Sequence, residues 1–391
     1  MASADEIADA RQRKLIGISD VATARGLKLW RSMDYNALDA SWERVAPALV
    51  AQSAAAQARS VSGADRFTSA ISGEYDFEPE SARIVPQAFV GVDGSGRPLE
   101  SLLHGAVTTT KEAVGAGLGA RQSMEAGANY LALMIKTALA DIGRSGDMVS
   151  SVGKGYTRYV RVVEPGACSR CVMLAGADQF KPFKRHPACK CTCQPVPSLD
   201  GINIPDSRTP QGVFEAMSEF DQDRAFGKAG AQAIRDGSDI SKVVSARRGA
   251  NYLPPAGKMP TKTQWNRMQK TTIGRRPDGT PVQVYSTSEA VTVRGSFGRQ
   301  QRATSATQRL AGARYSSTRR VRLMPEQIME ISGDNEILRK AFLRDAGYLE
   351  YRPKSGYDSG NKWLEEIRLQ RVADRKTVNK ATLAYGNFTL G

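Results

Sequence analysis

A cluster of metal-binding residue types in the middle of the chain constrains the fold more than any other feature. All five cysteines and one of the two histidines lie between Cys168 and Cys193. The cluster contains two pairs with the same spacing, Cys168 with Cys171 and His186 with Cys189, separated by 14 residues. Two such turns can supply the four nitrogen or sulfur ligands of a tetrahedral Zn²⁺. The segment therefore predicts a structural zinc site that ties neighbouring elements together.

The cluster offers six donors for four positions. Cys168 and Cys171 form the first pair, and His186 with Cys189 best repeats their spacing. Cys191 could replace either member of the second pair, because alternate residues of a strand share a face. Cys193 is expected to be the spare thiol. The predicted ligands are four of these five residues: Cys168, Cys171, His186, Cys189 and Cys191.

The residues around the cluster favour a structural metal over a catalytic one. A catalytic zinc needs an open coordination position and a general base nearby. The acids in the cluster or just before it are Asp178 and Glu164, and neither belongs to a helical metalloprotease motif. Reduced thiols or a redox pair are the alternative to a bound metal.

Length and charge bound the class of protein. A chain of 391 residues has room for two or three domains with a sizeable core. The net charge of +15 and a pI of about 9.7 favour a polyanionic partner. We expect no secretory leader and no membrane span, and hence a soluble chain made in a cytoplasm, where clustered cysteines bind metals more often than they form disulfides.

Apolar periodicity predicts helices before the cluster. Residues 3–72, 99–113 and 121–142 carry apolar side chains at helical spacing, and the Pro- and Gly-rich segment 74–98 reads as a loop. Pro47 lies inside the second helical pattern and is expected to kink or break that helix.

Strand and helix signals continue on the other side. The β-branched and aromatic run 156–163 predicts a strand that leads into the first cysteine pair. Thr209 and Pro210 form an N-cap and first-turn pair, 221–235 reads as one helix, and 325–390 regains helical patterns.

These signals predict a mainly α fold with a small β and zinc-knuckle unit, an α+β arrangement. We expect five regions along the chain, listed in order: a helical region over 1–150, the zinc-knuckle unit over 151–200, a helical continuation over 201–245, a basic flexible arm over 246–320 and a C-terminal helical region over 321–391.

Most of the net charge lies in the stretch 241–320. It has 16 Lys and Arg against two acids, a net of +14, with few large apolar residues. Apart from a hairpin allowed at 281–293, the composition favours a mobile arm. Sparse aromatics argue for contact with DNA phosphates rather than base stacking, and a solvated linker is the alternative. The candidate DNA-contacting residues are Arg247, Arg248, Arg275, Arg276, Arg299, Arg302, Arg319 and Arg320.

Other active sites have little support in the sequence. There is no P-loop, and no serine stands in a nucleophile elbow. A Ser-His-Asp protease would need His104, which lies among apolar residues and reads as a packed or rim side chain. We therefore expect no enzymatic activity.

The cluster and its flanks resemble a known family. The run E-P-G-A-C-S-R-C-V-M-L-A-G at 164–176, a variable loop, and R-H-P-A-C-K-C at 185–191 are similar to the C-x-x-C…H-P-x-C-x-C signature of MuF-like phage minor head proteins and the related minor capsid proteins of actinobacterial phages. Residues 220–244 are similar to the helices that follow the signature. The resemblance covers roughly 100–250, and Cys193 departs from the pattern.

The resemblance implies a structural minor capsid protein of a tailed bacteriophage that acts in head morphogenesis. It would be made in the host cytoplasm and packaged in the virion, inside the head near the portal. Its partners would be the portal protein, the major capsid protein and packaged double-stranded DNA bound without sequence preference, with no membrane. Two alternatives stay open: a capsid maturation protease, and a zinc-ribbon nucleic-acid-binding protein outside any virion.

Overall fold

The computed structural model describes residues 3–75, 77–179, 183, 186–198, 204–249, 269–275, 281–286, 307–308, 317–318, 323–351 and 361–384. The chain divides into two compact units. The first unit is Met1–Ala167 with Leu174–Ala216, and the second is Cys168–Met173 with Met217–Gly391. The described elements are mainly helices with small sheets, which confirms the predicted fold class.

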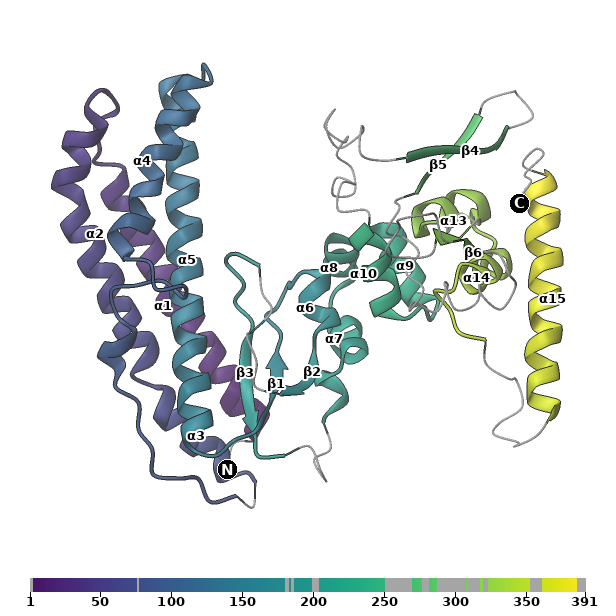
Figure 1. Ribbon diagram of the computed structural model, residues 1–391, viewed down its shortest axis with the longest axis horizontal. Helices are drawn as coiled ribbons and strands as arrows, with labels where there is room; N and C mark the ends of the chain where they lie inside the picture. The colour runs from purple at the N-terminus through teal and green to yellow at the C-terminus, as the bar shows by residue number, and fades with distance from the viewer. Residues whose placement is uncertain are drawn as a thin grey trace. The chain divides into compact units, whose positions relative to one another are not determined.

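The first unit is built on long helices (Figure 1), whose bounds follow in chain order: α1 Ala4–Trp30, α2 Leu38–Val61, α3 Ala64–Ser72, α4 Leu99–Gly115 and α5 Ala120–Gly153. One-turn 3-10 helices lie at Tyr35–Ala37 (η1) and Pro86–Phe89 (η2). Helices α1, α2, α4 and α5 lie side by side as a bundle. The helical predictions for 3–72, 99–113 and 121–142 are confirmed, and α5 runs eleven residues further than predicted.

Local capping explains where the first helix begins. The Ser3 hydroxyl accepts a hydrogen bond from the Glu6 backbone N–H at 3.3 Å, and the Glu6 carboxylate accepts one from the Ser3 N–H at 2.8 Å. This reciprocal pair satisfies two N–H groups that have no partner within the helix.

A kink or a break was predicted at Pro47; the helix is not broken there, because α2 continues through it. Proline removes one backbone hydrogen bond and crowds the preceding turn, which costs about 3 kcal/mol in a helix interior. The residues on either side, Val45, Ala46 and Leu49, are buried in the bundle core. Their burial offsets the local penalty.

Close helix contacts define the core of the bundle. A side chain added at Gly127 in α5 would overlap the Thr110 hydroxyl and the Trp30 ring, so only glycine permits this approach. The indole N–H of Trp30 donates to the Met124 carbonyl at 3.1 Å. The large buried side chains of this cluster include Trp30, Trp42, Leu49, Leu103, Leu131 and Ile135.

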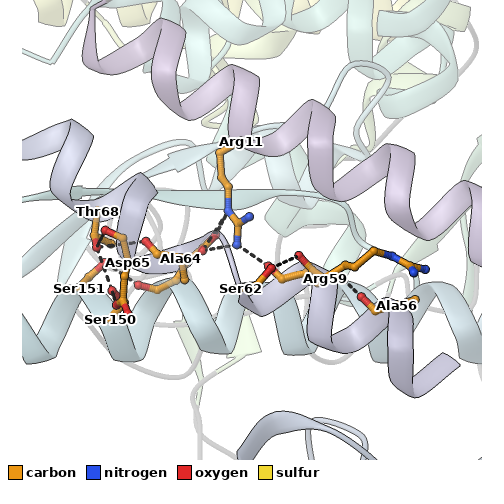
Figure 2. A network of polar contacts seen from close by, with 11 residues as sticks. Arg11, Ala56, Arg59, Ser62, Ala64, Asp65, Thr68, Ser150 and Ser151 are labelled. Atoms are coloured by element: carbon orange, nitrogen blue, oxygen red, sulfur yellow. Dashed lines mark hydrogen bonds and ion pairs between the residues drawn. The ribbon is translucent and has the colours of Figure 1, made fainter. Parts of the chain in front are cut away.

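Polar contacts cross the bundle, and Figure 2 shows Arg11 with the neighbouring Asp65, Thr68 and Ser150. The Arg11 guanidinium in α1 pairs with the Asp147 carboxylate in α5 at 2.7 Å and donates to the Ser60 carbonyl in α2 at 2.6 Å. Both charged side chains are almost fully buried. Beside them, the Ser150 hydroxyl donates to Asp65 at 2.6 Å and lies 2.8 Å from the Thr68 hydroxyl in α3. Polar contacts thus join α1, α2, α3 and α5.

A small antiparallel sheet follows the bundle, with strand order β2–β1–β3: β1 Arg158–Val162, β2 Gly176–Gln179 and β3 Thr192–Val196. The strand predicted over 156–163 is confirmed as β1. Arg161 is opposite Gly176 of β2 and Cys193 of β3. The first unit ends with the 3-10 turn η3 Asp206–Arg208 and α7 Pro210–Ala216. The Gly212 N–H in the first turn of α7 donates to the Thr209 hydroxyl at 3.1 Å, as expected of an N-cap.

The second unit is also helical. Its described helices are α6 Ser169–Met173, α8 Glu219–Phe226, α9 Lys228–Arg235, α10 Ile240–Gly249, α13 Pro325–Ser332, α14 Glu336–Asp345 and α15 Asn361–Ala384. The single helix predicted over 221–235 was wrong, since Gly227 has a φ of +71° and separates α8 from α9. Bidentate ion pairs join Arg339 to Asp236 and Arg344 to Asp374.

Part of the basic stretch is described. Strand β4 Gln269–Arg275 pairs antiparallel with β5 Pro281–Ser286, and β6 Thr307–Gln308 pairs with β7 Ser317–Thr318. The hairpin predicted within 281–293 differs, because the strand at 281–286 pairs with the residues before it; residues 287–293 lie outside the described residues. Among the described helices, none combines the length and apolar character needed to cross a bilayer.

We expect the Arg11–Asp147 pair to be a major stability determinant of the first unit. Asp147→Asn leaves a buried guanidinium without its counter-charge and should lower the free energy of unfolding by about 3–5 kcal/mol. Asp39→Asn, at the Lys111–Asp39 pair whose side chains are 50% and 68% exposed, should change it by less than about 1 kcal/mol. Urea unfolding followed by circular dichroism compares the two. Equal losses would contradict the structural role of the buried pair.

Candidate metal centre

The structure brings the five predicted ligands into two groups that share one residue. The donor atoms of Cys168, Cys171 and His186 all lie within 4.8 Å of one another, and so do those of Cys171, Cys189 and Cys191. Zinc–sulfur bonds of about 2.3 Å in tetrahedral geometry place neighbouring ligand atoms about 3.8 Å apart. The spacing therefore fits a metal ion with small adjustments, and Cys171 stands at the centre of the cluster.

The first pair is positioned by a turn and a short helix. Gly166 adopts a φ of +71°, and the Ala167 N–H donates to the Glu164 carbonyl at 3.1 Å. The Cys171 N–H then donates to the Cys168 carbonyl at 2.9 Å, which closes one helical turn. A C-x-x-C spacing in such a turn places both thiols on one side. Cys171 is buried and Cys168 is half-buried.

The second pair has its own turn. The Cys189 N–H donates to the His186 carbonyl at 3.2 Å, and Ala188 has a φ of +56°, uncommon for a residue with a side chain. The His186 Nδ1 lies 2.8 Å from the Pro187 carbonyl oxygen. Because a carbonyl only accepts, Nδ1 carries the proton there and Nε2 keeps the lone pair that can bind a metal.

The Cys189–Cys191 segment is held by side chains far away in sequence. One guanidinium nitrogen of Arg144, in α5, donates to the carbonyls of Cys189 at 2.7 Å and Cys191 at 3.0 Å. Its other terminal nitrogen pairs with Asp141, one turn earlier in the helix. The Gln12 amide in α1 donates to the Lys190 carbonyl at 3.4 Å and to the Val162 carbonyl at 2.9 Å.

Sequence reasoning missed Arg144, Asp141 and Gln12. The available signal was weak: Asp141 and Arg144 are three residues apart in a helical pattern, a spacing that solvent-exposed pairs share. An apolar pattern followed past residue 142 was the remaining signal that Asp141 and Arg144 lie on a buried part of the helix.

Cys193 stands apart from both groups. It lies in β3, is 1% exposed, and is opposite Arg161 in the sheet. Burial raises the pKa of the Cys193 thiol, with the Asp147 charge acting in the same direction. A neutral buried thiol packs as a small apolar side chain.

Glu164 binds the backbone just after the second turn. Its carboxylate accepts a hydrogen bond from the Lys190 N–H at 3.1 Å, and burial raises its pKa. The side chain of Asp178 lies outside the described residues. Mostly buried thiols beside one imidazole are suited to holding a metal ion tightly.

The other residues singled out in the sequence lie elsewhere. His104 is exposed on α4, with its ring edge-on to Trp42 at 5.4 Å between centroids, which is a rim position. The backbone of α10 includes Arg247 and Arg248, and that of β4 includes Arg275, but their side chains lie outside the described residues. So do the remaining DNA-contact candidates: Arg276, Arg299, Arg302, Arg319 and Arg320.

No protein-family model, no curated protein and no solved structure matches this chain.

Two buried cysteines provide a matched test of the centre. Cys171→Ser removes the thiol common to both groups, so bound metal should fall from about one ion per chain to near zero. Cys193→Ser replaces a thiol outside both groups and should leave the metal content unchanged. Elemental analysis of protein purified without chelator measures both. Loss of metal in Cys193→Ser alone would show that the ligand set is wrong.

Proposed function

We propose that this chain is a zinc-stapled structural protein of a tailed-phage head, of the MuF-like minor head type. The observation that carries the proposal is the convergence of Cys168-x-x-Cys171 and His186-x-x-Cys189-x-Cys191 around one buried thiol. Those residues are the ones on which the sequence resemblance rests. A protein of this kind would act in head assembly near the portal and contact the portal and major capsid proteins.

Zinc is the proposed metal because of the donor chemistry. Thiolates with an imidazole at tetrahedral spacing favour Zn²⁺ over harder ions such as Mg²⁺ or Ca²⁺, which prefer oxygen. When bound, zinc supplies folding free energy and no redox change. The chain's own residues bind it and bury it, which suits a structural role.

Charge supports contact with packaged DNA. The stretch 241–320 has a net charge of +14, close to the +15 of the whole chain. Lys and Arg that neutralise phosphates release condensed counterions, so the resulting affinity is strong at low salt and indifferent to sequence. Loose electrostatic contact of this kind suits a protein inside a head filled with DNA.

Analysis of phage particles tests the assignment to the head. We expect mass spectrometry of purified particles to find the intact chain in a few copies per head, and particles emptied of DNA to show whether it leaves with the genome. Absence from the particle would favour the nucleic-acid-binding protein outside a virion. Loss of major-capsid cleavage in a His104→Ala phage would favour the protease instead.

DNA binding is expected to be steeply salt-dependent. A chain that contacts about six to ten phosphates should lose roughly 10³–10⁵ in affinity between 50 and 200 mM salt. The variant should replace 250–320 with a neutral Gly/Ser linker of equal length, because α10 before it buries Val243 and Val244. That variant should lose most of the binding, as measured by fluorescence anisotropy with two unrelated duplexes. Affinity that is insensitive to salt, or that differs strongly between the duplexes, would contradict the electrostatic role.

A further inference from the structure

Arg144 links the polar side of α5 directly to the metal centre. One of its nitrogens donates to the carbonyls of both Cys189 and Cys191, the residues on either side of Lys190. Each of these cysteines is also a member of the buried ligand group. The side chain thus holds the backbone of two candidate ligands at once.

The guanidinium is itself held in place. It pairs with Asp141 on the same helix, and its central carbon lies 5.2 Å from the centre of the Phe183 ring. Arg144 and Asp141 are 3% and 7% exposed. A planar guanidinium fixed from two directions has little freedom to follow a moving partner. It therefore imposes its geometry on the carbonyls it touches.

Other side chains complete the cradle of residues 188–191. The Thr137 hydroxyl, one turn before Asp141, accepts from the Ala188 N–H at 2.8 Å. The Glu164 carboxylate accepts from the Lys190 N–H at 3.1 Å. Protein groups thus bind the backbone of this segment at several points, and none of these bonds involves a metal.

We propose that Arg144 is a positioning residue that fixes Cys189 and Cys191 before metal binds, so that this half of the centre is preformed. The inference rests on the proposed zinc site for its effect on affinity. Preorganised ligands avoid the ordering cost that a mobile loop would add to binding. Partners that orient metal ligands typically change affinity by about 10–100-fold when mutated.

The test uses Arg144→Lys, which keeps the charge but replaces the planar fork of two terminal nitrogens with one nitrogen on a shorter side chain. Asp141→Asn is a milder second variant that loosens the guanidinium. Arg339→Lys and Asp236→Asn are the controls, because they remove a comparable bidentate pair from the second unit. All are examined as full-length chains.

The first measurement needs no metal. In protein stripped of metal by chelator, mass spectrometry follows alkylation of each cysteine by iodoacetamide. Cys193, buried in β3, reports unfolding of the whole unit, so the quantity of interest is the rate at Cys189 and Cys191 relative to Cys193. We expect this ratio to rise about 10-fold in Arg144→Lys and a few-fold in Asp141→Asn, and to stay at the wild-type value in both controls.

The second measurement is the zinc dissociation constant by chelator competition, which should rise about 10–100-fold in Arg144→Lys. Ratios and affinities within twofold of wild type in both variants would overturn the positioning role. If Arg144→Lys does not fold, an unchanged alkylation ratio in Asp141→Asn would by itself overturn the positioning role. A wild-type chain that binds no zinc, yet shows the alkylation difference, would overturn the zinc assignment and support the positioning role.

Discussion

The first unit depends on burying charge along one side of α5. Asp147 pairs with Arg11 of α1, and Arg144, one turn earlier, binds the backbone at Cys189 and Cys191. Removing such charges from water costs free energy, and a partner at hydrogen-bond distance from each charge offsets that cost. Because a buried pair tolerates only one geometry, these contacts fix how α1, α5 and the cysteine segment fit together.

Periodicity made most of the helices predictable, and the errors have clear physical causes. Local rules placed a kink or a break at Pro47, but α2 is unbroken there and buries Val45 and Leu49 in the core. Local rules also missed the separation of α8 from α9, because the left-handed backbone of Gly227 leaves no trace in apolar spacing. In the first case tertiary packing overrode a strong local signal. In the second case Gly227 was present in the sequence, but a glycine can lie either inside a helix or at its end.

The candidate metal centre was also predictable only in part. Spacing identified the donors, because a C-x-x-C or H-x-x-C turn is a local structure that brings its own side chains together. The cradle was not predictable, since Arg144 lies 45 residues from Cys189 and carries nothing in its neighbourhood that marks it as buried. Polar residues in a long amphipathic helix are normally predicted to face solvent. Here that face is covered by the cysteine segment and by α1.

The two cysteine pairs of the centre are held by different elements, and this determines what a bound metal would stabilise. Cys189 and Cys191 are held by α5, whereas Cys168 and Cys171 belong to a short turn and the five-residue helix α6. A helix of that length is not stable by itself in water. Metal binding would then contribute mainly by ordering the turn that carries Cys168 and Cys171. The free energy of binding would stabilise α6 and the residues that follow it, while the bundle would keep its fold through its own core and its buried ion pair. The effect of such a metal ion would be to hold the short segment around α6 in place.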